Sequence, residues 1–80
     1  MATRRVKLTF PSDLITEPLI YELGKKFEII SNIRRADVRE SIGWVVLELK
    51  GDESEIDSGV EWMRLAGVRV DPISGDVIEG

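Results

Sequence analysis

The sequence predicts one small α+β domain, in which four antiparallel strands form a sheet and two helices cover one of its faces. Three observations lead to this prediction. The chain has 80 residues, the size of a single small domain. Apolar and polar residues alternate in several short segments, as they do in half-buried strands, and recur with helical spacing in two others. The helical segments interrupt the strand segments so that the element order is β-α-β-β-α-β.

The first strand is expected over residues 4–10, where apolar and polar residues alternate strictly. Pro11 lacks a backbone N–H donor and should end this strand. A helix is expected over residues 17–26 with Thr16 as its N-cap, because threonine caps helices well and proline is tolerated in the first turn. The buried stripe of this helix consists of Leu19, Ile20, Leu23 and Phe27.

The segment over residues 29–38 is strand-like, but its apolar residues do not keep to one side. A strand buried on both faces, or a strand with a β-bulge, would produce this pattern. Residues 39–43 are expected to form the following turn. The next strand is clearer, because residues 44–50 alternate regularly and place Val45, Leu47 and Leu49 on one side.

A second helix is expected after Gly51, with Asp52 at the N-cap and Glu55 three residues later, in the manner of a capping box. Gly67 suits the left-handed residue that ends such a helix. A last strand is expected over residues 68–72. The domain should therefore span residues 3–73, followed by a polar, frayed tail over residues 74–80. The inner stripe of the second helix consists of Ile56, Gly59, Val60, Met63 and Ala66.

Two βαβ halves with right-handed crossovers give the ferredoxin-like fold, with the spatial strand order 4-1-3-2. Both helices then lie on one face of the sheet. On the other, open face, Arg5 or Lys7 should form a cross-strand ion pair or cation–π contact with its neighbours on the third strand. Trp44 on this face, like Trp62 on the second helix, is either peripheral core or an interface residue. The open face carries Arg5, Lys7, Thr9, Trp44, Val46 and Glu48.

The composition excludes several kinds of chemistry. The chain contains no Cys and no His, so it cannot form disulfides, Cys- or His-ligated metal sites, or a Ser-His-Asp or Cys-His nucleophile. No glycine-rich phosphate loop occurs. The carboxylates of residues 52–61 are better explained as a helix cap and a solvated helix face than as acid–base catalysts or a calcium loop. We therefore expect no enzyme activity, no cofactor and no metal.

The charge is uneven along the chain, with a net charge of +3 over residues 1–39 and -7 over residues 40–80. A nucleic-acid patch is one interpretation of the basic half. We favour the interpretation that the two halves fold together, because RNA recognition on this fold needs stacking aromatics on the first and third strands. No signal peptide or membrane-length apolar stretch is visible, so a cytoplasmic protein without membrane insertion is expected.

The strand over residues 29–38 should be an edge of the sheet, and an unpaired edge is managed by charge, by a bulge or by pairing. Its three isoleucines favour pairing with a second copy of the chain. A domain of this size also often gains stability by association. The alternative is that Arg34 and Arg35 keep the edge from pairing. The expected interface residues are Ile29, Ile30, Arg35 and Trp44.

The sequence resembles the NIL domain family, a ligand-binding regulatory module found at the C-terminus of bacterial methionine-importer ATPases. The resemblance runs over residues 5–73 and rests on an ordered set of short matches. It implies an ACT-like βαββαβ fold that dimerises through its sheet, binds methionine near the dimer interface and regulates transport. The matches are VKLTF at 6–10, EPLI at 17–20, Asn32 and Ile33 with Ala36, GWVVLEL at 43–49, Gly51 with Asp52, and GVRV at 67–70.

The resemblance and, independently, the residues before the first helix each indicate where a ligand could bind. The family takes its name from an Asn-Ile-Leu run, which reads Asn32-Ile33-Arg34 here. If Arg34 faces the pocket, an anionic ligand is favoured, whereas an Arg34 that faces water carries no information. Ser12 and Thr16 lead into the first helix, whose N-terminal N–H groups favour a carboxylate, and the partner copy would supply Asn32. The alternative is that Ser12 and Thr16 are only turn and cap residues.

We therefore expect a free-standing, non-enzymatic homodimer that acts as a sensor or adaptor and binds a small amino-acid-like ligand, methionine or a related metabolite. Another protein would have to pass its signal on. The alternative is a protein-interaction module that binds no ligand and docks on a larger transporter or metabolic enzyme.

Overall fold

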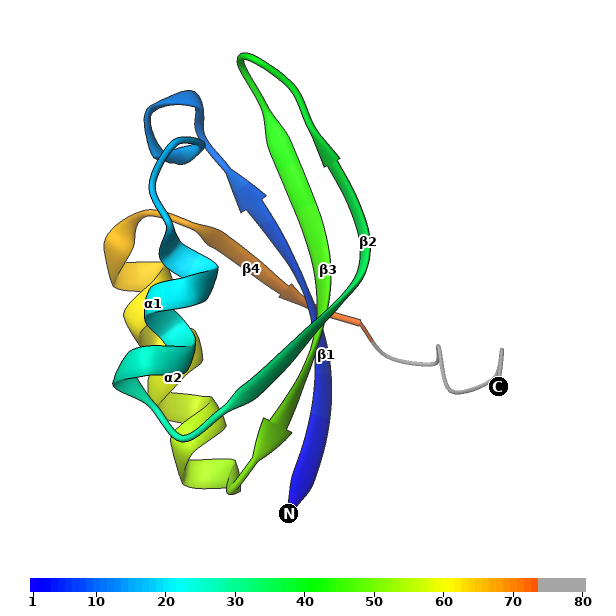
Figure 1. Cartoon of the computed structure of the whole chain (residues 1–80), viewed down its shortest axis with the longest axis vertical. Coiled ribbons are helices and arrows are strands. Elements are labelled where there is room, and N and C mark those ends of the chain that lie inside the picture. Colours follow the sequence, from blue (N-terminus) through cyan, green and yellow to red (C-terminus); the bar gives the residue numbers. More distant parts are fainter. Residues whose placement is uncertain (74–80) are drawn as a thin grey trace.

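The computed structural model describes residues 1–73 and has the predicted order of strands and helices (Figure 1). The predicted tail over residues 74–80 lies outside the described residues. No helix of the described part is long and apolar enough to cross a membrane. The elements are β1 (Ala2–Phe10), a short 3-10 helix η1 (Ser12–Leu14), α1 (Leu19–Lys26), β2 (Ile30–Val38), β3 (Gly43–Gly51), α2 (Glu53–Ala66) and β4 (Arg69–Pro72).

The strands form one antiparallel sheet in the order β2-β3-β1-β4. This is the predicted order, and it makes β2 and β4 the two edges. Figure 1 shows α1 and α2 together on one face of the sheet, and no described helix covers the other face. The ferredoxin-like fold predicted from the sequence is therefore confirmed.

The hydrophobic core lies between the sheet and the two helices. Because β1 and β3 alternate regularly, their buried side chains fall opposite each other, as when Val6 pairs with Leu47 and Leu8 with Val45. Leu23 of α1 and the buried stripe of α2 close this layer from the other side. The core consists of Val6, Leu8, Phe10, Leu19, Leu23, Ile29, Val45, Leu47, Leu49, Ile56, Val60, Met63, Val68 and Val70.

The start of α1 differs from the prediction. The helix begins at Leu19, with Pro18 at the N-cap and no side-chain cap hydrogen bond, so the prediction that Thr16 caps a helix from Glu17 is wrong. A proline disfavours the helical conformation at the residue before it, and here that residue is Glu17. Thr16 instead lies in a turn between η1 and the helix.

The two ends of α2 fall where the sequence predicts them, but one contact differs. Gly67 ends the helix with a φ of 108°, in the left-handed region that glycine adopts without strain. Asp52 occupies the N-cap position, yet its side chain makes no capping hydrogen bond. Glu55 does not complete a capping box either, because its Oε1 accepts a 2.8 Å hydrogen bond from the backbone N–H of Glu28. This bond ties the first turn of α2 to the connection between α1 and β2.

Strand β2 contains the β-bulge that was one of the two interpretations of its pattern. The register against β3 shifts between Ile33 and Arg35, so Arg34 is the additional residue. Before the bulge, Ile33 pairs with Leu47 on the helix-covered side, and after it Arg35 pairs with Val46 on the open side. The shift explains why no single alternation describes this strand.

Candidate functional site

A pocket of about 210 Å³ lies beside the N-terminal end of α1. Its walls come from the end of β1, from the segment that enters α1, and from the ends of β2 and β3 that meet at their hairpin. Drug-sized ligands usually occupy pockets of about 300–1,000 Å³, so this volume suits a molecule the size of one amino acid. The pocket is lined by Phe10, Ile15, Glu17, Pro18, Leu19, Ile20, Tyr21, Val38, Gly43 and Val45.

The walls of this pocket are mostly apolar, and polar groups occur where α1 begins. Phe10, Leu19 and Val45 are buried, whereas the side chain of Val38 is 58% exposed. The N–H groups in the first turn of a helix have no intrahelical acceptor, and they favour carboxylates. Glu17 is the one charged residue among the lining residues. The arrangement offers an apolar wall, backbone donors and a carboxylate around one small volume.

The predicted ligand-binding residues are not brought together within one protomer. Ser12 and Thr16 are exposed and do not line the pocket. Asn32 pairs with Glu48, which pairs with Arg5, whereas the pocket is level with Phe10 at the end of the same strand. Five residues of strand separate these levels, or roughly 17 Å. Asn32 also lies on the open side of the sheet with Glu48, so it does not reach this pocket within its own protomer.

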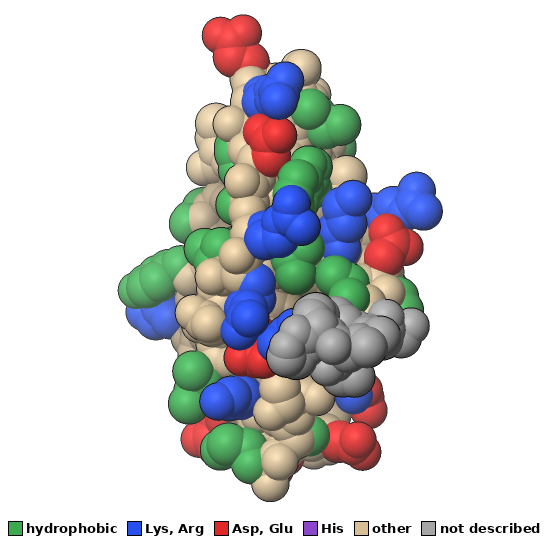
Figure 2. Space-filling model, turned by 90° about the vertical axis from the view of Figure 1, so that its right-hand side faces the viewer, with side chains coloured by type: hydrophobic (Ala, Val, Ile, Leu, Met, Phe, Trp, Pro, Cys, Tyr) green, Lys and Arg blue, Asp and Glu red, His purple; other side chains and the backbone are tan. Residues whose placement is uncertain are grey.

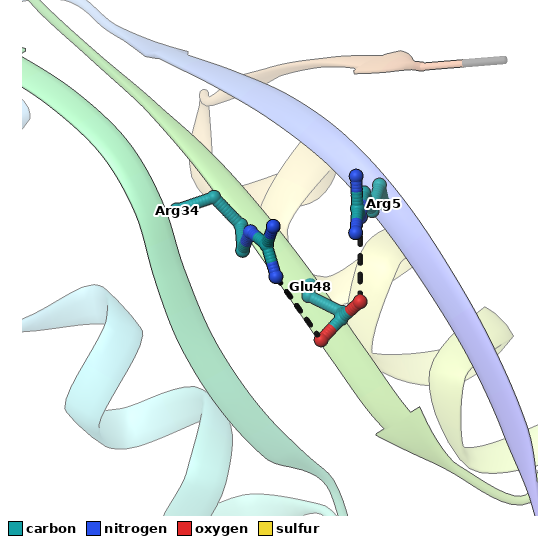
Figure 3. A network of polar contacts seen from close by, with 3 residues as sticks. All are labelled: Arg5, Arg34 and Glu48. Atoms are coloured by element: carbon teal, nitrogen blue, oxygen red, sulfur yellow. Dashed lines mark hydrogen bonds and ion pairs between the residues drawn. The ribbon is translucent and has the colours of Figure 1, made fainter. Parts of the chain in front are cut away.

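Arg34 does not line the pocket and lies on the open side of the sheet. Its Nη1 is 3.9 Å from Oε1 of Glu48, and the Nε of Arg5 donates a 3.3 Å hydrogen bond to the other carboxylate oxygen (Figure 3). The side chain of Glu48 is 15% exposed. One half-buried carboxylate thus joins the β1, β2 and β3 strands.

The expected interface residues lie in different environments. Ile30 is 64% exposed at the start of β2, and Arg35 is exposed further along the strand. Ile29 precedes the strand and is only 6% exposed, because its side chain belongs to the core. It therefore offers no surface to a partner, and we leave it out of the proposed interface.

The two tryptophans are both half-buried. Trp44 lies on the open face with the Nζ of Lys7 5.1 Å from its ring centroid, which is the predicted cation–π contact. Trp62 packs at the border of the core, and its ring meets that of Phe27 edge-on at a centroid distance of 6.1 Å. Trp44 thus lies on the open side of the sheet, whereas Trp62 packs against Phe27 on the helix side.

The open face of the sheet is predominantly basic. In Figure 2, which views the molecule from the right-hand side of Figure 1, Lys and Arg side chains run along this face with a smaller number of carboxylates among them. The strand register places Arg69 of β4 beside Thr9, and Asp71 beside Lys7. The basic residues of this face are Arg5, Lys7, Arg34, Arg35, Lys50 and Arg69, and the acidic ones are Asp37, Glu48 and Asp71.

Two ion pairs at the border of this face form between near neighbours in the chain. Arg69 contacts Asp71 at 3.0 Å, and Arg39 contacts Asp37 at 3.1 Å. The hydrogen bond from Arg39 to Asp37, together with the charge of Asp37, raises the pKa of Arg39 above its ordinary value. The guanidinium of Arg39 therefore stays charged at any physiological pH.

A second groove lies between α2 and the β1–β4 side of the sheet. It is lined in part by an ion pair of 2.9 Å between Arg4 and Asp57, and by Arg64, which donates a hydrogen bond to the carbonyl oxygen of Val70. Arg4, Asp57 and Arg64 therefore already have partners within the protein. Across residues 1–73, Asp and Glu form no group of three or more that could hold a metal ion.

Three comparisons with known proteins agree with one another. The family model described as the NIL domain matches residues 4–72. The methionine import ATP-binding protein MetN of Lacticaseibacillus paracasei is 26% identical over 74 residues, which cover 88% of this chain. The match covers 21% of MetN, so the chain spans about a fifth of that relative.

The fold has a counterpart among solved structures. The C-terminal domain of an ABC transporter ATP-binding protein from Enterococcus faecalis superposes with a TM-score of 0.78 and 20% sequence identity. The superposition covers 90% of this chain and 84% of that domain.

Proposed function

This chain belongs to the NIL domain family, and on that premise we propose that it is a regulatory module that binds a small amino-acid-like ligand as a homodimer. The proposed ligand is methionine or a related metabolite, and the proposed module is non-enzymatic and cytoplasmic. The observation that carries the proposal is the apolar pocket beside the N-terminal end of α1. The similarity to a protein named for methionine import supports the choice of ligand.

The chemistry of the pocket suits an amino acid with an apolar side chain. Phe10, Leu19 and Val45 provide an apolar wall for a thioether or alkyl group. The first-turn N–H groups of α1 are suited to the ligand carboxylate, and Glu17 to its ammonium group. In this proposal Ser12 and Thr16 do not contact the ligand. They contribute only through the conformation of the segment before α1.

The dimer is proposed because β2 is an edge strand of the sheet and carries exposed isoleucines. If the β2 strands of two copies run antiparallel, the Asn32 end of one strand lies toward the Val38 end of the other. Such pairing would also cover part of the exposed Ile30 and Ile33, which are 64% and 56% exposed. The bulge at Arg34 interrupts the edge, so we assign the pairing to the stretches on either side of it.

Calorimetric titration tests the ligand half of this proposal. The purified chain is titrated with methionine, with other sulfur metabolites and with a set of apolar and charged amino acids. A saturable heat with methionine or another member that carries an apolar side chain is the expected result. Absence of heat from all of them at millimolar concentration would overturn ligand binding.

A second candidate function is docking on a larger transporter or enzyme without a ligand. The observation that favours it is the basic open face, where the half-buried Trp44 lies under the Lys7 ammonium group. The two candidates are compatible, since the pocket is bounded by the helix layer and the docking face is on the other side of the sheet. Affinity capture compares the proteins retained by the unmodified chain with those retained by the Trp44→Ala variant. A docking partner should be lost from the variant, whereas ligand binding in the pocket does not require Trp44.

A further inference from the structure

We propose that the open face of the sheet is a docking surface for a protein partner with an acidic surface. The open face consists of the sheet side chains that point away from α1 and α2. This proposal rests on the docking function proposed as the second candidate and names the partner, and it is independent of the ligand site, because none of the charged residues of the face lines the pocket beside α1. The proposal rests on the side chains of the face, its charge and the partners that its residues already have.

The centre of the open face has the composition of an interface core. Lys7 pairs with Val46 and Thr9 with Trp44, and all four side chains are half-buried. Tryptophan and arginine are enriched at binding hot spots, where a partner excludes water from an aromatic side chain. Arginines occur on both sides of this centre, on β2 and on β4. A surface with an aromatic side chain at its centre and a charged rim is typical of protein–protein contacts.

The charge of the face identifies the partner by complementarity. Within residues 1–73, six basic and three acidic residues lie on the open face, whereas the whole chain has a net charge of -4. The rest of the molecule must therefore be strongly acidic, and the open face is the region that attracts carboxylates. Such asymmetry steers an oppositely charged partner into register and raises its association rate. Two copies placed face to face would bring basic residues together, which disfavours the same chain as the occupant.

The contacts of the face favour a protein over a nucleic acid. Trp44 is the one aromatic residue on the face within residues 1–73, and the Lys7 ammonium group lies over its ring. Nucleic-acid bases need exposed aromatic faces on which to stack. The carboxylates of Glu48 and Asp71, paired with arginines, would repel phosphates but can accept cations from a protein surface of mixed charge.

Amide NMR spectra of the intact chain test this proposal without a change of sequence. The probe is a short peptide of alternating glutamate and leucine, added at about 0.15 M ionic strength, where long-range attraction is screened. The amide signals of Lys7, Trp44 and Val46 are expected to shift, and those of α1 are not. A peptide with lysine in place of glutamate, a single-stranded oligouridine and anionic lipid vesicles are tested in parallel.

Matched charge reversals provide the second test. Lys50→Glu with Arg69→Glu reverses two charges on the open face outside the proposed β2 interface, and Lys25→Glu with Lys26→Glu makes the same change on α1. The first pair is expected to weaken binding of the glutamate peptide about tenfold or more, and the second pair about twofold or less. Urea denaturation of each variant verifies that it is folded.

Three results would overturn the proposal. The first is the absence of shifts on the open face with the glutamate peptide, and the second is an equal loss of affinity in both reversal pairs. The third is stronger binding of oligouridine or of vesicles to the same amides, which would assign the face to phosphate groups. All of these measurements are made without methionine, so their outcome is independent of the proposed ligand site.

Discussion

Arg5 and Glu48 lie directly opposite each other on β1 and β3, and their side chains meet with the Arg5 Nε 3.3 Å from the Glu48 Oε2. Arg34 approaches the other oxygen of the same carboxylate from the bulge of β2. The carboxylate is 15% exposed, so water screens this network less than it screens a surface ion pair. The network connects the edge strand β2 to the centre of the sheet.

Replacing Glu48 with Gln should lower the free energy of unfolding by about 1–2 kcal/mol, because two guanidinium groups lose the carboxylate between them. Urea denaturation measures this loss. Asp37→Asn is the matched control, since it removes the partner of Arg39, whose side chain is 73% exposed. The control should leave stability nearly unchanged, because water screens an exposed pair of this kind. Equal losses in the two variants would contradict the structural role of Glu48.

Two glycine-to-alanine substitutions should have opposite effects. A Cβ on Gly51 would lie 2.7 Å from the backbone carbonyl oxygen of Glu28, which cannot move without disturbing the connection into β2. Gly51→Ala should therefore destabilise the domain by about 1–3 kcal/mol. A Cβ on Gly24 meets nothing closer than 3.8 Å, and Gly24→Ala should stabilise α1 by about 0.5–1 kcal/mol. Thermal unfolding compares the two, and a stabilised Gly51→Ala would show that this contact is misplaced.

A charge at the pocket should block the proposed ligand. Val38 lines the pocket with 58% of its side chain exposed, so Val38→Lys keeps the fold and places an ammonium group beside the apolar wall. We expect methionine affinity to fall about tenfold or more by calorimetry. Leu65→Lys on α2 makes the same kind of change at a side chain that is 79% exposed and lies outside the pocket. If the two variants bind methionine equally, the ligand lies elsewhere.

The proposed dimer predicts the mass of the protein in solution. Light scattering at micromolar concentration should give the mass of two chains. Ile30→Asp with Ile33→Asp should shift the protein toward the monomer, because two carboxylates on each β2 strand would then face those of the other copy. Ile42→Asp in the hairpin, at a side chain that is 53% exposed, is the matched control. A monomer of the unmodified chain at this concentration would overturn the dimer.

The fold could be predicted because local sequence patterns determine most of its strands and helices. Strict alternation on β1 and β3 decides which side chains are buried, and Gly67 marks the end of α2 by its conformation. The sequence placed Arg5 or Lys7 beside the third strand, and the register of the structure assigns Arg5 to Glu48. Where local rules compete, prediction failed, as at Thr16, whose capping preference is overruled by the backbone restriction that Pro18 imposes on Glu17.

The site was less predictable, because its walls come from distant parts of the chain. Phe10, Val38 and Val45 line the pocket, and no spacing in the sequence links them. Each also reads as an ordinary strand residue. The sequence did place a ligand near the start of the first helix, where Ile15, Glu17 and Pro18 line the pocket, but it named Ser12 and Thr16, which do not. Arg34 lies on the open side of the sheet because of the bulge in β2. The alternation of apolar and polar residues does not define where that bulge falls.

The pocket beside α1 is proposed to bind a small amino acid, and amide NMR spectra recorded during a methionine titration follow that site residue by residue. Saturable shifts are expected, and they should be largest for Phe10, Leu19, Val38 and Val45. Unchanged spectra at millimolar methionine and with the other amino acids, or saturable shifts confined to residues outside the pocket, would contradict it.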